Sequence, residues 1–358
     1  MYSFLYTHIL ARMDAEAVHH RALAGLELLG RVPPARAALR AALAVDTAGM
    51  EVEALGMRFA HPLGLAAGFD KEGRCLPAIH ALGFSFAEIG TVTPRPQPGN
   101  PAPRLFRLME DHALINRLGF PSEGAGAVAT RLKRRGAFPV GISLGKNKDT
   151  PLTDAGQDYS AVLRLLYPYG DFFVVNISSP NTPDLRRLQT REYLSDLLAS
   201  LMETARSLGG GAARPLLIKI APDLTWDEID TLLDLALAHG IAGVIATNTT
   251  IRRDGLHSAA LAESGGLSGQ PLRERSTEII RHIYRVTGKR LLIIGVGGVF
   301  TGDDAWEKLR AGATLIQAYT GFIYEGPAFT RKVLRGLRGR MRAEGVARLA
   351  EIIGGAEA

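Results

Sequence analysis

Cysteine is nearly absent from this sequence of 358 residues, which contains only Cys75. A single thiol excludes an intramolecular disulfide and any multi-cysteine metal or iron–sulfur site, and it fits a reducing compartment. Histidine pairs with the H-E-x-x-H spacing of zinc enzymes are also missing. We therefore expect no metal site.

Long hydrophobic runs are missing as well. No window reaches the roughly 18 consecutive apolar residues that a membrane-spanning helix needs. The N-terminal stretch, interrupted by Asp14 and Glu16, has neither the charged start and apolar core of a signal peptide nor a visible transit peptide. We therefore expect no spanning segment, and the missing transit peptide argues against the mitochondrial inner membrane.

The charge balance is basic, with 42 lysines and arginines against 36 acidic residues and a net charge of +6. Such a balance is compatible with nucleic acid, anionic lipid or acidic substrates. However, no basic stripe interleaves with aromatic residues, and the cluster at 131–135 closes a helical pattern, where cations suit the helix dipole. We therefore expect no nucleic-acid partner. A hydrophobic content of 46% indicates a globular protein with a large core.

Short apolar runs alternate with helical patterns from residue 63 to about 343. The expected strands are 63–66, 86–90, 139–144, 172–177, 215–220, 243–247, 291–295 and 314–318. The expected helices are about 73–81, 122–135, 155–166, 191–207, 226–238, 272–286, 303–310 and 327–343. Thr225 and Glu228 have capping-box spacing before the fifth helix. Strict alternation of eight such units predicts an α/β fold, a (β/α)8 TIM barrel over 46–358. A doubly wound open sheet is the alternative.

Residues 1–45 lie outside this alternation. Helical spacing of apolar residues predicts a helix within 2–13, and Asp14 can cap a second helix that ends at Pro33 and Pro34. These helices either pack on the barrel or form a small α-helical domain that lies on a membrane surface. Periodicity alone favours packing, since apolar helical faces usually serve cores.

In a barrel of this type, function lies at the carboxyl ends of the strands, and here every strand end is glycine-rich or polar. Gly297, Gly298 and Gly321, with the flexible segment 265–269, allow backbone amides to approach a phosphate. A Ser-His-Asp hydrolase fits poorly, because no strand end carries a histidine. The pattern therefore favours a phosphate-bearing ligand.

Polar side chains at the strand ends indicate what else the ligand contains. Amide side chains there can pair with a pyrimidine or flavin ring, and four are present: Asn116, Asn176, Asn181 and Asn248. Lys71 and Lys219 follow or end strands, where a fixed positive charge can stabilise an anion. Taken singly, the alternatives are turn residues and surface lysines.

The sequence resembles the quinone-dependent class (class 2) of dihydroorotate dehydrogenases, which are flavoenzymes of pyrimidine biosynthesis. The resemblance covers nearly the whole chain and rests on the motifs AGFDKEG, GTVTPRPQPGN, INRLGF, GKNKDTP, NISSPNTP, ATNTT, GGLSG and GVGG. It implies oxidation of dihydroorotate to orotate. The hydride would pass to one FMN per chain, and electrons would then pass to a membrane quinone, either ubiquinone or menaquinone.

The resemblance also implies roles for individual residues. Ser179 resembles the catalytic base, at the position where the cytosolic class has cysteine. The residues similar to substrate contacts are Lys71, Asn116, Arg117, Leu118, Gly119, Phe120, Asn176, Asn181, Asn248 and Thr249. The residues similar to FMN contacts are Ala67, Gly68, Phe69, Asp70, Lys71, Thr91, Ser143, Asn176, Lys219, Thr247, Gly269, Gly298, Tyr319 and Thr320. Ser143 departs from the family's usual asparagine, and a hydroxyl replaces only one of its amide hydrogen bonds.

In this class the N-terminal helices lie on the membrane and form a tunnel by which quinone reaches FMN. The resemblance therefore assigns residues 1–45 to quinone access, with His19, Arg107 and Tyr319 at the inner end of the tunnel. The expected location is peripheral, on the cytoplasmic face of a bacterial inner membrane. One rival is the cytosolic class, which passes electrons to fumarate or NAD. Another is a phosphate-binding isomerase or lyase without flavin, which would be colourless.

Overall fold

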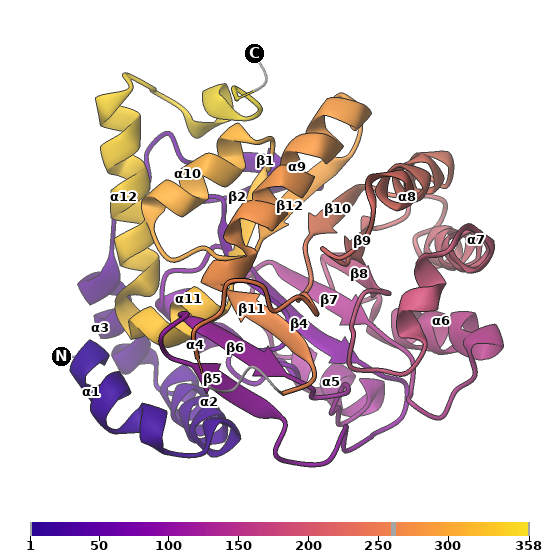
Figure 1. Ribbon diagram of the computed structural model, residues 1–358, viewed down its shortest axis with the longest axis horizontal. Coiled ribbons are helices and arrows are strands. Elements are labelled where there is room, and N and C mark those ends of the chain that lie inside the picture. The colour runs from indigo at the N-terminus through magenta and orange to yellow at the C-terminus, as the bar shows by residue number, and fades with distance from the viewer. Residues whose placement is uncertain (1, 259–262, 357–358) are drawn as a thin grey trace.

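Eight parallel strands close into a barrel in the computed structural model, which describes residues 2–258 and 263–356 (Figure 1). In chain order the strands are β3 (Leu63–Leu65), β4 (Ala87–Val92), β7 (Val140–Leu144), β8 (Phe172–Asn176), β9 (Leu216–Ile220), β10 (Gly243–Ala246), β12 (Leu292–Val296) and β13 (Leu315–Ala318). The last strand pairs with the first, with Ile316 opposite Leu63, so the sheet has no free edge. The predicted barrel is confirmed, and the open-sheet alternative is wrong.

The eight predicted helices are all present, with ends that differ from the sequence patterns by up to three residues. They are α4 (Leu76–Ala81), α5 (Ala125–Leu132), α6 (Ala155–Leu166), α7 (Arg191–Leu208), α8 (Trp226–Ala238), α9 (Arg273–Thr287), α10 (Gly302–Arg310) and α12 (Phe329–Ala343). The predicted capping box forms at α8, where the Thr225 N–H donates to Glu228 Oε2 over 2.8 Å. Between β13 and α12 lies a short helix that the sequence did not predict, α11 (Thr320–Glu325).

A hairpin of β1 (Val52–Ala54) and β2 (Met57–Phe59), also not predicted, closes the amino-terminal end of the barrel. The Phe59 ring packs edge-on against Phe86 with centroids 5.3 Å apart, and Phe86 packs similarly against Phe172. These rings fill the barrel because Gly64 has no side chain: a Cβ there would overlap the Phe86 ring. The barrel interior is therefore solid at this end, and space for a ligand remains only at the other.

A three-stranded antiparallel sheet lies outside the barrel, in the order β11, β6, β5. Its strands are β5 (Leu105–Leu108), β6 (Ala113–Asn116) and β11 (Gly266–Gly269). β5 and β6 interrupt the connection from β4 to α5, and β11 interrupts that from β10 to α9. The prediction of a flexible glycine-rich segment at 265–269 is therefore wrong, since Leu267 pairs with Ile115 in a regular ladder.

The N-terminal segment forms three helices, one more than predicted: α1 (Tyr2–His8), α2 (Ala15–Arg31) and α3 (Pro33–Leu43). Asp14 caps α2 as predicted, because its Oδ1 accepts a 2.8 Å hydrogen bond from the Ala17 N–H. Pro33 and Pro34 follow the end of α2 but also occupy the first turn of α3, where proline is favoured.

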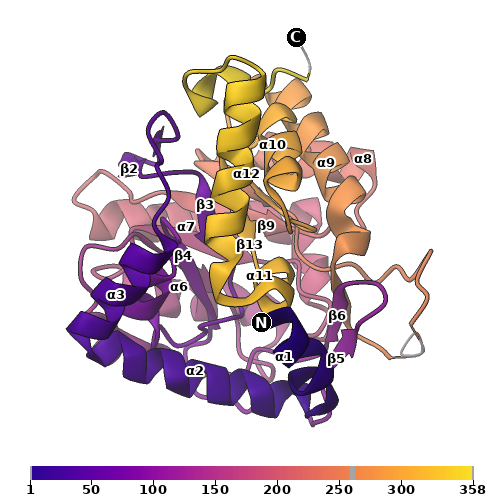
Figure 2. The same ribbon diagram turned by 90° about the vertical axis from the view of Figure 1, so that its left-hand side faces the viewer.

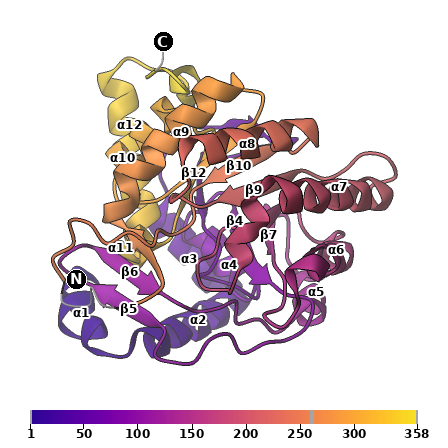
Figure 3. The ribbon, with the colours of Figure 1, turned by 45° about the vertical axis from the view of Figure 1, so that its right-hand side comes forward.

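The N-terminal helices pack along one side of the barrel. Figure 2 shows α2 along one edge of the molecule, with α3 at one end and α1 at the other, near β5 and β6. Both α2 and α3 contact α4. In Figure 3, α6, α7 and α8 lie on the side away from α1. None of the helices in the described part of the chain is long and apolar enough to cross a membrane.

Gly64→Ala should destabilise the protein by about 1–3 kcal/mol, because the new methyl group would overlap the Phe86 ring in a closed core. The matched control is Gly339→Ala, since a Cβ at Gly339 in α12 meets no atom within 4 Å. Replacing an exposed helical glycine should stabilise by roughly 0.5–1 kcal/mol. Urea unfolding of the two variants measures both effects, and equal midpoints would contradict this account of the barrel interior.

Candidate active site

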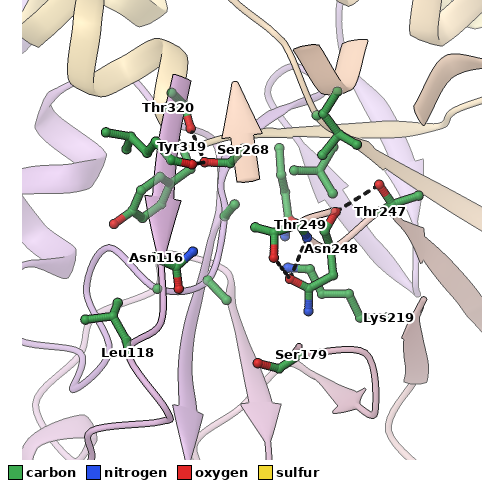
Figure 4. Close-up of a pocket in the computed structure, with 18 of the residues that line it drawn as sticks. Asn116, Leu118, Ser179, Lys219, Thr247, Asn248, Thr249, Ser268, Tyr319 and Thr320 are labelled. Carbon is green, nitrogen blue, oxygen red and sulfur yellow. Dashed lines mark hydrogen bonds between the residues drawn. The ribbon is translucent and has the colours of Figure 1, made fainter. Parts of the chain in front are cut away.

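A cavity opens at the carboxyl ends of the barrel strands and encloses about 1080 Å³ of unoccupied space, part of it open to solvent. This size is sufficient for a small-molecule or cofactor site. Most of the predicted site residues line it: Ala67, Gly68, Lys71, Thr91, Asn116, Leu118, Gly119, Phe120, Asn176, Ser179, Asn181, Lys219, Thr247, Asn248, Thr249, Gly269, Gly298, Tyr319 and Thr320. Figure 4 shows several of these side chains facing a common space.

Four of the predicted substrate and FMN contacts, Phe69, Asp70, Arg117 and Ser143, do not line the cavity. The Asp70 carboxylate accepts hydrogen bonds from the Arg74 and Cys75 N–H groups, so it orders the turn before α4. The Arg117 guanidinium pairs with Glu263 at 2.5 Å and lies over the Phe106 ring. The Phe69 ring is buried behind the cavity wall, against Tyr319.

Ser143 also lies behind the wall, fully buried within β7. Its hydroxyl shares a 2.9 Å hydrogen bond with Thr91 Oγ1, and Thr91 also accepts one of 2.7 Å from Asn176 Nδ2. The run Gly141–Gly145 has G-x-S-x-G spacing, but Ser143 lies inside a strand rather than on an exposed turn. Ser143 therefore orients Thr91, which lines the cavity, and is not a nucleophile.

The four asparagines form two hydrogen-bonded pairs at the cavity wall. Asn248 Nδ2 donates to Asn176 Oδ1 over 3.3 Å and to Ser178 Oγ over 3.0 Å. Asn181 Nδ2 donates to Asn116 Oδ1 over 3.0 Å. These bonds fix which way each amide points, so donors and acceptors are presented to a ligand in a set pattern. The predicted convergence of these side chains is confirmed.

Ser179 lies on the loop after β8 and is almost completely buried. Its Oγ accepts a 3.3 Å hydrogen bond from the Asn181 N–H, which orients the hydroxyl toward the cavity it lines. The loop is held from behind by Arg186, whose Nε donates to the Ser178 carbonyl over 3.1 Å. Arg186 Nη2 also donates to the Thr249 carbonyl over 3.1 Å.

Asp223 completes this clamp, because its Oδ2 lies 2.8 Å from Arg186 Nη1 and its Oδ1 accepts from the Thr250 hydroxyl. One ion pair thus joins the loops after β8, β9 and β10. Sequence reasoning missed both residues. The available signal was a basic residue just beyond NISSPNTP and the acidic residue that ends KIAPD.

Backbone amides line the end of the cavity near β12 and β13. Within the described residues, the N–H groups of Gly298, Val299, Thr320 and Gly321 have no acceptor from the protein. All four residues line the cavity. Several free amides on neighbouring loops form a site for the oxygens of a phosphate, as the glycine pattern predicted.

Two lysines add positive charge. Lys219 Nζ lies 3.4 Å from Glu88 Oε2, which also accepts a 2.8 Å hydrogen bond from Gln317 Nε2 at the cavity floor. Lys71 Nζ donates to the Gly68 carbonyl over 3.0 Å. Burial lowers the pKa of Lys71 to about 8, although Glu16 and Glu72 act in the opposite direction. The alternative interpretation, that Lys71 and Lys219 are surface lysines, is therefore wrong.

A row of rings leads from the cavity to α2. Tyr319 lines the cavity, Phe69 lies edge-on to it with centroids 6.2 Å apart, and His19 of α2 lies edge-on to Phe69 at 5.3 Å. Burial and the nearby Lys71 lower the pKa of His19 to about 3, so its ring is neutral near pH 7. Arg107 on β5 donates to the Met13 carbonyl, which precedes α2.

The loop before β5 ties α2 to the Ser179 loop. Glu16 on α2 accepts three hydrogen bonds of 2.7–3.0 Å from Arg104. Arg104 Nη1 donates to the Asn100 carbonyl over 2.7 Å, and Asn100 Nδ2 donates to the Asn181 carbonyl over 3.0 Å. Sequence reasoning did not single out these three linking residues. Each connects segments that are distant in the chain.

An α/β barrel with free amides for a phosphate, an amide-lined wall, and one buried and one half-buried lysine defines an enzyme that binds a phosphate-bearing ring. The family model for dihydroorotate dehydrogenase matches residues 49–341. The chain belongs to this family, which confirms the resemblance of its motifs.

Individual relatives extend the match to the N-terminal helices. The dihydroorotate dehydrogenase (quinone) of Thermus thermophilus is 50% identical over 98% of this chain and 99% of that protein. That of Gloeobacter violaceus is 51% identical over 97% and 96%. A crystal structure of an Eimeria tenella DHODH in complex with ferulenol superimposes with a TM-score of 0.89 at 34% identity, and it covers 99% of this chain and 98% of that one.

Arg186→Gln should loosen the Ser179 loop, because the Ser178 and Thr249 carbonyls lose their charged donor. We expect faster amide hydrogen exchange at 178–182 and 249–251, read by mass spectrometry. The matched control is Arg187→Gln, since Arg187 is the exposed neighbour of Arg186. Equal exchange in the two variants would show that the clamp does not order the loop.

Proposed function

We propose that this protein oxidises dihydroorotate to orotate in de novo pyrimidine biosynthesis, with FMN as cofactor and a membrane quinone as the final acceptor. The observation that carries the proposal is the wall of hydrogen-bonded asparagines beside Ser179, which matches a planar ring with amide groups. Family membership and the names of the relatives support it. The serine at 179 and the N-terminal helices distinguish it from the cytosolic class.

The residues present fit FMN. The free amides of Gly298, Val299, Thr320 and Gly321 suit its phosphate, since dianionic oxygens favour clustered N–H donors. Lys219, with Thr91 and Asn176, supplies charge and hydrogen bonds to the ring. Bound FMN accepts the hydride from the substrate and passes electrons onward. Family membership argues against a flavin-free isomerase or lyase.

Ser179 is the catalytic base in this proposal. Oxidation of dihydroorotate removes a proton from C5 and a hydride from C6, so the C5–C6 bond becomes double. A serine hydroxyl is a weak base unless it is positioned and desolvated. Ser179 is buried, and the Asn181 N–H fixes its Oγ. The proton would leave the buried hydroxyl through a threonine or water.

Substrate binding is assigned to the two asparagine pairs and to Lys71. Asn116, Asn176, Asn181, Asn248 and Thr249 present amide and hydroxyl groups to the ring. Arg117 is excluded from direct contact in this arrangement, because its guanidinium pairs with Glu263. The Lys71 ammonium would offset the substrate carboxylate.

Quinone access is assigned to the segment 1–45, whose helix α2 reaches the cavity through His19, Phe69 and Tyr319. We propose that this segment is a distinct functional unit that lies on the surface of the bacterial inner membrane, on its cytoplasmic face. Exposed apolar side chains on α1 and α2, or just after them, support this arrangement: Phe4, Leu5, Ile9, Leu28 and Val32. A neutral His19 presents an uncharged ring to an uncharged quinone.

Anaerobic mixing tests cofactor, substrate and acceptor together. The purified protein should be yellow, and dihydroorotate should bleach the flavin absorbance. A short-chain quinone should then restore it, whereas fumarate and NAD should not. A colourless protein that regains no activity with FMN, or a flavin that dihydroorotate does not bleach, would overturn the proposed function.

Ser179→Ala should slow flavin reduction by dihydroorotate by about 10²–10⁴-fold, the usual contribution of a general base. Stopped-flow absorbance measures this half-reaction directly. Ser178→Ala is the matched control: Ser178 Oγ accepts from Asn248 but is not the proposed base, so its loss should cost less than about tenfold. Equal rates in the two variants would remove Ser179 from the role of base.

Orotate affinity should fall as pH rises through about 8, the pKa to which burial lowers Lys71. Below that pH the ammonium attracts the orotate carboxylate, and above it the neutral amine does not, so affinity should fall up to about tenfold per pH unit. Flavin-absorbance titrations from about pH 6.5 to 9 measure this effect. Lys71→Gln should bind orotate more weakly but with little pH dependence. A wild-type affinity that is flat across this range would contradict the assignment.

A further inference from the structure

A second, surface groove lies between α3, α4 and the turn after α5, away from the cavity described above. It encloses about 1430 Å³ of unoccupied space, part of it open to solvent. Its cationic side chains come from distant parts of the chain: Arg36 and Arg40 from α3, and Arg134 and Arg135 from the turn after α5. No residue of this groove lines the cavity described above, although its α3 residues belong to the segment 1–45.

The groove carries positive charge that the protein does not neutralise. None of the described residues that line it is acidic. The charge of Arg135 is already neutralised, because its guanidinium forms a bidentate ion pair with Asp171 at 2.8 Å. In the part of the chain that the structure describes, Arg36 and Arg134 have no carboxylate partner.

Arg40 contacts only a neutral group. Its guanidinium touches the His80 ring, which stacks on Phe138 with centroids 4.9 Å apart. Burial and Arg40 itself lower the pKa of His80, so this ring accepts a hydrogen bond without adding charge. Three arginines thus face a single groove without a counter-ion, and their mutual repulsion is relieved by a bound anion.

The position of the groove indicates which kind of anion it binds. The groove begins at Pro33 and Arg36, directly after Leu28 and Val32, whose side chains are 66% and 38% exposed. Phe4 and Leu5 on α1, and Ile9 just after it, are also exposed, but they lie at the other end of α2. A cationic groove bordered by exposed apolar side chains matches the interface of a membrane, where phosphates lie beside acyl chains.

We propose that this groove binds the phosphate headgroup of an anionic phospholipid. Guanidinium groups suit phosphate because their N–H donors match two of its oxygens at once. The inference rests on the membrane-surface association in the proposed function and adds a specific lipid contact to it. Nucleic acid is the weaker alternative, since the rings of Phe138 and His80, which line the groove, already stack on each other.

Vesicle binding by the full-length, flavin-loaded protein tests the inference. Cosedimentation is measured with phosphatidylcholine vesicles that contain or lack phosphatidylglycerol. Arg36→Ala/Arg40→Ala/Arg134→Ala should lose on the order of 100-fold in affinity for the anionic vesicles, because each cation near an anionic surface contributes a similar share of the binding free energy. Its binding to pure phosphatidylcholine and its flavin reduction by dihydroorotate should not change.

A charge-matched control separates the groove from net charge. Arg164→Ala/Arg206→Ala/Arg285→Ala removes three exposed cations from α6, α7 and α9, on other sides of the barrel. This control should bind anionic vesicles as the wild type does. Equal losses in the two triple variants would overturn the inference.

Three further outcomes bear on the proposal. If the groove variant loses binding to duplex DNA or to soluble glycerol phosphate but keeps its affinity for anionic vesicles, the lipid headgroup is wrong. If the wild type binds phosphatidylcholine and phosphatidylglycerol vesicles equally, only the groove inference falls. If the wild type binds neither vesicle, the proposed membrane association falls with it, whereas flavin bleaching still tests the dehydrogenase activity independently.

Discussion

Closure of eight parallel strands into a barrel is the constraint on which the rest of this structure depends. Parallel strands share a direction, so closure places all eight carboxyl ends around a single rim. The hairpin β1–β2 and the rings of Phe59, Phe86 and Phe172 fill the opposite end. Polar residues that are scattered along the sequence therefore meet in one cavity, and a ligand has only one end of the barrel to enter.

Without a ligand, the buried polar groups of the cavity lower the stability of the folded protein. Buried amides and hydroxyls need partners, and here they largely serve one another, as Asn248 does with Asn176 and Ser178. Two oxygens at the floor, Glu88 Oε1 and Gln317 Oε1, have no partner in the described part of the chain. The N–H groups of Gly298 and Gly321 are similarly free. A site built in this way is preorganised for a polar ring and a phosphate, because few groups must reorient when the ligand binds.

The regular part of the fold could be predicted from the sequence because each unit repeats the same pattern. The strands, their helices, the Asp14 cap and the Thr225 capping box all follow from local residue order. The strand-end asparagines were predicted for the same reason. The motifs then supplied the family, which periodicity alone could not provide.

The missed features have a different physical origin. β5 and β6 have four residues each, too few for a clear period, and their partner β11 lies far along the chain. The Arg186–Asp223 pair depends on two loops that meet only after the barrel closes. Helix α3 was missed because its prolines were interpreted only as an end, although proline also suits a first turn.

The chain of contacts from Glu16 through Arg104 and Asn100 to Asn181 has a consequence for grafting. The N-terminal helices cannot be exchanged between relatives on their own, although they precede the barrel in the sequence. A chimera that takes these helices from a relative must keep an acidic residue at 16 opposite an arginine at 104. Otherwise Arg104 loses its carboxylate partner. An exchange of residues 1–45 therefore succeeds only when the loop before β5 matches the new helices.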